Sequence, residues 1–173
     1  MRRSGRGSKS KARISSPFQT ATFELEGMLF EADRNTARAL AAYTQAIELG
    51  SANFYPYYRK AVLTATRDAA ARVQAEQLLE RAVMLAPRFA PALVMLADVK
   101  VALARAADAL PIARRAAALD PARVPARLAL ARALWAVSQK DEAVRVAREA
   151  LELARSDPER QIVQRLIDTY TRP

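Results

Sequence analysis

The sequence predicts an all-α protein built from stacked pairs of helices, and three observations carry that prediction. Apolar residues make up 51% of the 173 residues, which is enough for a buried core. Ala, Leu, Arg and Glu dominate, Gly occurs only 4 times, and few stretches alternate polar and apolar residues as strands do. Small residues also recur at a nearly constant spacing, which is typical of repeat architectures.

Columns of matching residues define the repeat. In the three strictest columns, successive members lie about 34 positions apart, and the first interval is two positions longer than the others. The three strictest columns are Ala39, Ala75, Ala109 and Ala143; Ala46, Ala82, Ala116 and Ala150; and Leu49, Leu85, Leu119 and Leu153. A fourth column of small residues precedes the first at a constant offset, except that Ala61 lies two positions further from its partner Ala75; its members are Gly27, Ala61, Ala97 and Ala131. We therefore expect a turn about two residues longer than the others near "TRDAAARV".

This pattern resembles the tetratricopeptide repeat family, whose 34-residue unit has a small residue at position 8, Ala at positions 20 and 27, and often Pro at position 32. The resemblance covers most of the chain and implies a right-handed α-α superhelix of the tetratricopeptide (TPR) type. In this register the four units span residues 20–53, 54–89, 90–123 and 124–157. The sequence departs from the family where Glu26 and Lys60 replace Leu, where Lys100 and Ala113 replace large residues, and where the turn within each unit lacks Gly.

Each unit is expected to contain two helices of roughly a dozen residues, because a helix pair buries its apolar face only by stacking on its neighbours. Pro91 and Pro125 fit the first turns of the leading helices of the third and fourth units, where a missing N–H costs nothing. Pro111 fits the third position of the second helix of the third unit if Asp108 caps that helix.

Residues 158–173 are expected to form a capping helix after the fourth unit. The segment "DPERQIVQRLIDTY" begins with an Asp cap and a Pro, and then places Ile162, Val163, Leu166, Ile167 and Tyr170 on one stripe. With this helix the prediction is nine helices, covering about 80% of residues 17–170.

Residues 1–16, "MRRSGRGSKSKARISS", differ in kind from the repeats. They carry six Lys or Arg and no acid, so they contribute +6 of the net charge of +10, and we predict a disordered basic tail. Such a tail is either an arm for nucleic acid or acidic membranes or, as we favour, a linker remnant or an artefact of where the chain starts. With no apolar run of membrane-spanning length and no secretory apolar segment, we expect no transmembrane segment and a cytoplasmic protein as written.

The residue types present argue against catalysis. The sequence has no Cys and no His, which excludes disulfides, thiolate metal ligands, cysteine nucleophiles and the commonest acid-base group. Acidic clusters at residues 24–33 and 141–152 have neither a nucleophile nor a metal-binding partner in sequence, and no phosphate-binding or hydrolase motif occurs. We therefore predict no enzyme, no cofactor and no metal site.

The family resemblance implies binding of a peptide or partner protein in a concave groove lined by the leading helices. We carried the family's groove positions onto this sequence, and the set is mostly apolar and aromatic. The predicted groove residues are Glu24, Met28, Glu31, Tyr55, Tyr58, Val62, Val94, Asp98, Val101, Leu128, Arg132 and Trp135. Tyr57 is expected in the core, whereas Tyr58 and Trp135 fit packing and recognition equally well.

Three other interpretations are possible. Chaperone-type carboxylate binding would need Lys and Asn where the first unit has Glu24 and Met28, so terminal chaperone motifs are poor ligands. The net positive charge suggests an RNA-binding repeat protein, but Arg132 is the only basic residue in the predicted groove. Most arginines fall on second helices, whose exposed side is convex; examples are Arg81, Arg114, Arg115, Arg145 and Arg148. The repeats could also belong to a larger bacterial enzyme or membrane-associated protein, and self-association stays open.

Overall fold

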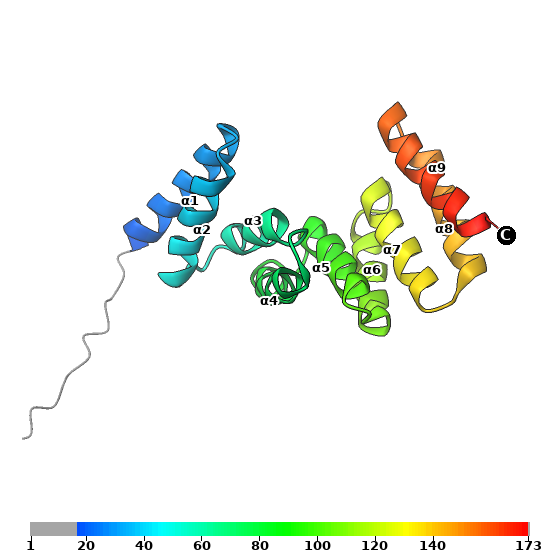
Figure 1. Cartoon of the computed structure of the whole chain (residues 1–173), viewed down its shortest axis with the longest axis horizontal. Helices are drawn as coiled ribbons and strands as arrows, with labels where there is room; N and C mark the ends of the chain where they lie inside the picture. The colour runs from blue at the N-terminus through cyan, green and yellow to red at the C-terminus, as the bar shows by residue number, and fades with distance from the viewer. Residues whose placement is uncertain (1–16, 173) are drawn as a thin grey trace, which may run out of the picture.

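The computed structural model describes residues 17–172, which contain nine α-helices and no strand (Figure 1). Helices account for 81% of this range, as predicted. The basic tail lies outside the described residues. The helices are α1 (Pro17–Ala32), α2 (Thr36–Glu48), α3 (Phe54–Thr64), α4 (Ala69–Leu85), α5 (Ala90–Ala102), α6 (Ala106–Leu119), α7 (Val124–Ala136), α8 (Lys140–Leu153) and α9 (Asp157–Thr171).

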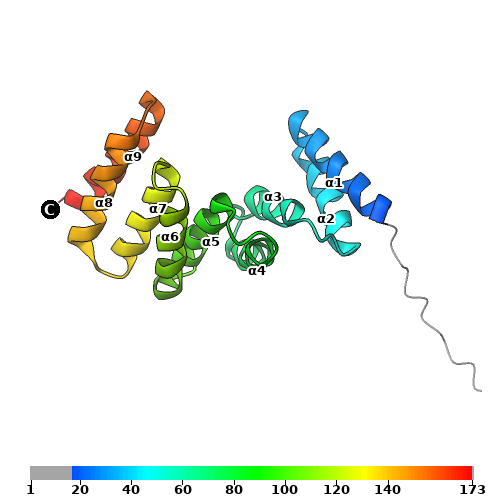
Figure 2. The same cartoon turned by 180° about the vertical axis from the view of Figure 1, so that it is seen from behind.

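The helices form successive pairs along an elongated molecule. α1 packs with α2, α3 with α4, α5 with α6 and α7 with α8, and α9 packs on α8. We call the first helix of each pair the leading helix and the second the trailing helix; each trailing helix also contacts the next leading helix. The α1–α2 pair and α9 lie at opposite ends of the array (Figures 1 and 2). The fold is the predicted right-handed α-α superhelix, and no helix within residues 17–172 is long and apolar enough to cross a membrane.

The repeated alanines lie fully buried in the packed interior of the array. Ala39, Ala75, Ala109 and Ala143 have no exposed surface. In the column of small residues, Gly27 is the exception to Ala because a Cβ atom there would lie 2.4 Å from Cε1 of the buried Tyr43 ring. The period therefore reflects helix contacts that leave no room for a longer side chain.

The extra residues of the second pair lengthen helix α4 more than they lengthen the turn between α3 and α4. The turns at residues 33–35, 103–105 and 137–139 have three residues, and the turn at residues 65–68 has four. The predicted difference of two residues is therefore wrong. α4 starts six residues before Ala75, whereas α6 starts three residues before Ala109. Residues 69–71 are all Ala, the strongest helix former, so α4 gains nearly one turn at its start.

Two predicted helix caps are also wrong. Asp108 does not cap α6, which begins at Ala106 after Arg105, so Pro111 lies inside the helix with an exposed side chain. The reason is that Ala104 adopts the left-handed conformation that ends the turn, so Arg105 becomes the N-cap and the helix begins at Ala106. α9 is capped by Ser156 rather than Asp157, because Ser156 and Glu159 complete a reciprocal capping box. Pro91 and Pro125 do lie in the first turns of α5 and α7.

Each three-residue turn contains a non-glycine residue in the left-handed region. The φ angles are 56° at Arg34, 58° at Ala104 and 64° at Ser138. This conformation costs an L-residue roughly 1–2 kcal/mol, and the turns are where the family has Gly. The absence of Gly therefore costs stability without preventing the turn.

Replacing Ala104 by glycine should raise the free energy of unfolding by about 0.5–1 kcal/mol, because the relief of left-handed strain exceeds the entropy that glycine loses on folding. Ala104 is exposed, so no packing is lost. Urea denaturation checks the result. The matched control is Ala118→Gly at an exposed helical position of α6, which should destabilise the protein. Equal losses in both variants would contradict the prediction.

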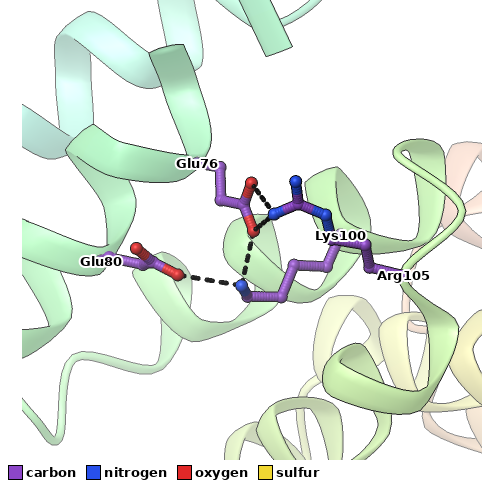
Figure 3. Close-up of polar contacts among 4 residues, drawn as sticks. All are labelled: Glu76, Glu80, Lys100 and Arg105. Carbon is purple, nitrogen blue, oxygen red and sulfur yellow. Dashed lines mark hydrogen bonds and ion pairs between the residues drawn. The ribbon is translucent and has the colours of Figure 1, made fainter. Parts of the chain in front are cut away.

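A buried charge network occupies the contact between α4 and α5 (Figure 3). Lys100 is 8% exposed and Glu76 is 4% exposed. The Lys100 Nζ donates to Oε1 of Glu76 at 2.6 Å and to Oε1 of Glu80 at 2.9 Å. Nη1 of Arg105 donates to both carboxylate oxygens of Glu76, at 2.9 and 2.7 Å. Lys100 thus fills a position where the family has a large residue, and Glu76 compensates its buried charge.

The pKa values of this network follow from the pairing. Burial opposes the charge of Glu76, but the hydrogen bonds and charges of Lys100 and Arg105 outweigh it and lower the pKa of that carboxyl. Burial also opposes the charge of Lys100, but Glu76 and Glu80 outweigh it and raise the pKa of the ammonium group. Both groups therefore stay charged near neutral pH.

Candidate functional site

We call the face formed by α1, α3, α5 and α7 the leading-helix face; it carries the residues that the sequence placed in the groove. Ion pairs join successive leading helices on this face. Glu31 of α1 pairs with Arg59 of α3, and Asp98 of α5 pairs with Arg132 of α7. The structure therefore brings together residues that are 28 and 34 positions apart in the sequence.

Glu31 joins three helices. Nε of Arg59 donates to its Oε2 at 2.8 Å, and Nη2 of Arg59 donates to its Oε1. The hydroxyl of Tyr43, a fully buried residue of α2, donates to Oε2 at 2.7 Å. The hydrogen bond from Arg59 is the main cause that lowers the pKa of Glu31, and burial raises the pKa of Tyr43. The Glu31 carboxylate therefore has a structural role, and its charge is already paired within the chain.

Glu24 also makes structural contacts. Its Oε1 accepts a hydrogen bond from the Ser51 hydroxyl at 2.5 Å, and its Oε2 accepts one from the Asn53 side-chain amide at 2.9 Å. Asn53 caps α3 by accepting from the backbone N–H of Tyr55. Glu24 thus holds the start of the second helix pair against α1.

Asp98 and Arg132 form a two-point ion pair. Nε of Arg132 donates to Oδ1 of Asp98 at 2.8 Å, and Nη2 donates to Oδ2 at 2.6 Å. Burial raises the pKa of Asp98, and the charge and hydrogen bonds of Arg132 oppose that shift. The only basic residue of the predicted groove is therefore neutralised by its neighbour.

The aromatic residues of the predicted groove are half-buried and in contact with other rings. Trp135 stacks on Tyr170 of α9, with ring centroids 4.1 Å apart and planes 5° apart. Tyr58 meets Phe89 edge-on at 5.1 Å, and Tyr55 meets the Tyr43 ring at 6.3 Å. Trp135 therefore helps to attach α9, and all three residues keep part of their surface exposed.

The exposure of the other predicted residues varies. Leu128 is only 6% exposed and belongs to the core shared by α7 and α8, so the expectation that it lines an accessible strip is wrong. Val62, Val94 and Val101 are half-buried, and Met28 is exposed. Tyr57 is in the core, as predicted, and its hydroxyl donates to the Ser51 carbonyl at 2.9 Å.

A cavity of about 330 Å³ opens between the turn that follows α3, the start of α4, and α5. α5 packs closely on α7, whereas α3 has no comparable contact with α5 within residues 17–172. The cavity is lined by Ala65, Thr66, Arg72, Met95, Asp98, Val99 and Ala102. Arg72 lies on α4 directly after the three added alanines, and among the described residues its guanidinium has no ion-pair partner. Sequence reasoning missed it because groove positions were taken from leading helices alone.

The arginines predicted for the convex side are exposed. These are Arg81, Arg114, Arg115, Arg145 and Arg148. Arg115 donates to the carbonyl of Pro87, and Arg145 pairs with Glu142 and Glu149 on its own helix. In the part of the chain that the structure describes, no group of three or more acidic residues is arranged to hold a metal ion.

Comparison with known proteins supports the fold. No family model and no curated protein matches the sequence. Solved structures do match, at low sequence identity. MamA 41-end from Desulfovibrio magneticus RS-1 is 16% identical with a TM-score of 0.72, covering 88% of this chain and 83% of that one. MamA MSR-1 is 20% identical with a TM-score of 0.69, covering 88% and 85%. The chain shares its helical-repeat fold with MamA.

Proposed function

We propose that the protein is a non-catalytic scaffold that binds a peptide or partner protein on the leading-helix face. The observation that carries the proposal is that the charges on this face satisfy one another, while aromatic and aliphatic side chains between them stay partly exposed. Glu31 pairs with Arg59 and Asp98 pairs with Arg132, while Tyr58 retains accessible surface. An apolar strip bordered by fixed polar groups is how interaction surfaces are built.

The cavity between the α3–α4 turn and α5 suggests the chemistry of the ligand. Its walls include the apolar side chains of Ala65, Met95 and Val99, and Arg72 adds a positive charge. We expect an aliphatic side chain of the ligand to enter the cavity and an adjacent acidic group to meet Arg72. The chain therefore favours ligands that combine aliphatic and acidic residues.

The charge pairing also argues against RNA binding by this face. Phosphate recognition requires cations that are available to the backbone of the nucleic acid. Arg59 and Arg132 are each held by a carboxylate, which leaves Arg72 as the remaining cation at the cavity. A single cation does not make the basic stripe that RNA-binding repeat proteins need.

Truncating Tyr58 to alanine should weaken partner binding by about 2 kcal/mol, the size typical of an aromatic anchor. The partner is first captured from source lysate with and without nuclease, and binding is then measured by calorimetry at two salt concentrations. Because the contact is apolar, the loss should barely change with salt. Arg72→Glu should also weaken binding, with a marked salt dependence.

The control is Arg114→Glu on the convex side, which should leave the affinity unchanged. Thermal unfolding of each variant separates lost binding from lost folding. The proposal fails if Arg114→Glu abolishes binding while Tyr58→Ala has no effect, or if nuclease releases the captured partner.

A further inference from the structure

A second cavity, of about 450 Å³, lies between α3 and α4, and we call it the Lys60 cavity. Its walls are formed by side chains of both helices, namely Tyr57, Lys60, Gln74, Gln77, Leu78 and Arg81. None of these residues lines the cavity that contains Arg72. The two charged residues of the Lys60 cavity are both cations, so no carboxylate on its walls neutralises them.

The polar side chains of this cavity have no partners within the chain. In the part of the protein that the structure describes, neither Lys60 nor Arg81 takes part in an ion pair. The side-chain amides of Gln74 and Gln77 make no hydrogen bond to any other described residue. Two cations and two amide groups are therefore available to a ligand at one place.

Comparison within the repeat shows that a cation at the position of Lys60 is unusual. This position directly precedes the column of small residues, and its equivalents in α5 and α7 are Leu96 and Leu130, which are 3% and 8% exposed. The cluster that contains Leu96 packs against Ile112 of α6, and Leu130 lies in one cluster with Val146 of α8. A buried leucine thus joins the two helices of those pairs, whereas the half-buried Lys60 borders a cavity.

The position of Arg81 differs in the same way from its equivalents. It directly precedes the second column of alanines, where α6 has Arg115 and α8 has Glu149. Arg115 donates to the carbonyl of Pro87, and Glu149 pairs with Arg127 of α7. The equivalents of Arg81 are thus engaged within the chain, so the second pair is the one with an unpaired cation on each of its two helices.

We propose that the Lys60 cavity binds a phosphate monoester group. Near neutral pH such a group carries a charge of about −1.5 to −2 and has three acceptor oxygens, which match two cations and two amide donors. A guanidinium can donate to two phosphate oxygens at once, and an ammonium group acts as a point charge. A single carboxylate has only one charge and would leave one of the two cations unpaired.

The cavity also has room for carbon atoms beside the phosphate. Its volume falls within the range of small-molecule sites, roughly 300–1,000 Å³. The ring of Tyr57 and the side chain of Leu78 provide an apolar wall next to the cations. The phosphate therefore belongs to an organic molecule, which is either a free ester or a phosphorylated side chain of a partner protein.

The first test is a titration of the full chain, labelled with ¹⁵N, with inorganic phosphate at constant ionic strength. The expected result is a saturable shift of the side-chain amide signals of Gln74 and Gln77, because these groups lie on the cavity wall. Sodium acetate should bind at least tenfold more weakly. Equal responses to phosphate, acetate and chloride would mean that the cations attract any anion, and would overturn the proposal.

Two variants test the roles of the cations. Lys60→Leu introduces the residue that α5 and α7 have at this position, so it should keep the urea midpoint at least as high as that of the wild type while weakening phosphate binding at least tenfold. Arg81→Gln should weaken binding by a similar factor. The matched control is Arg114→Gln, an exposed arginine of a trailing helix outside the cavity, which should leave the affinity unchanged. Equal losses in Arg81→Gln and Arg114→Gln, or full binding by Lys60→Leu, would overturn the proposal.

A comparison of ligands identifies the source of the phosphate. The probes are glycerol 3-phosphate, a short peptide containing phosphoserine, and the same peptide without phosphate. Equal affinities for the ester and the phosphopeptide assign the site to a free ester, and an affinity at least tenfold higher for the phosphopeptide assigns it to a phosphorylated partner. If the peptide without phosphate binds as tightly as the phosphopeptide, and Lys60→Leu changes neither affinity, the cavity is not a phosphate site.

Discussion

Replacing Lys100 by methionine is expected to lower the free energy of unfolding by about 3 kcal/mol, because it leaves the carboxylate of Glu76 buried with one of its two partners removed. Arg105 still donates to Glu76, so the effect lies at the lower end of what breaking a buried ion pair costs. Lys and Met have similar helix propensities, so the change tests the charge and not the helix. Urea denaturation at neutral pH measures the loss.

Two further variants test whether the loss comes from the uncompensated charge of Glu76 or from lost side-chain packing. Glu80→Gln should cost less than about 0.5 kcal/mol, because Glu80 is half exposed and solvent screens its pair with Lys100. The double variant Lys100→Met and Glu76→Leu should recover most of the stability, because neither buried charge remains. If the double variant is less stable than Lys100→Met alone, the explanation by an uncompensated charge is wrong.

Truncating Glu31 to alanine is expected to cost about 2.5 kcal/mol, because it removes hydrogen bonds from two helices and leaves the buried hydroxyl of Tyr43 without its acceptor. Alanine is the strongest helix former, so the loss does not come from α1 itself. A double-mutant cycle with Tyr43→Phe, followed by urea denaturation, measures the coupling. The two losses should be clearly non-additive, and additive losses would mean that the hydroxyl finds another partner.

The same carboxylate makes stability depend on pH. The pKa of Glu31 is lower in the folded chain than its ordinary value of 4.5, and the direction is the same for Glu76. The folded state therefore binds protons less readily than the unfolded state, so this stability is fully present above pH 4.5 and is lost as the pH falls through the lower folded values. The urea midpoint of the wild type should fall on acidification, and that of Glu31→Ala should fall less steeply. Equal slopes would contradict a paired Glu31.

The sequence by itself determined the helices and their order. Ala39, Ala109 and Ala143 recur because a close helix contact admits only a small side chain, and that requirement repeats with every helix pair. Periodicity of this kind depends on residues near one another in the chain, so it can be read without the structure. The same reasoning predicted the fold, a final helix after the fourth pair and the exposed arginines of the trailing helices.

Only the tertiary structure decided which charged and aromatic side chains are available to a partner. Leu128 is buried and Trp135 supports α9, although both occupy groove positions in the sequence register. Lys100 is compensated by Glu76, which lies on another helix 24 residues away in the sequence. The pairing of such groups depends on how helices are placed in space, and the packing of α4 against α5 also places Arg72 at the cavity. Local sequence patterns fix where a helix forms, but contacts between helices fix what each side chain meets.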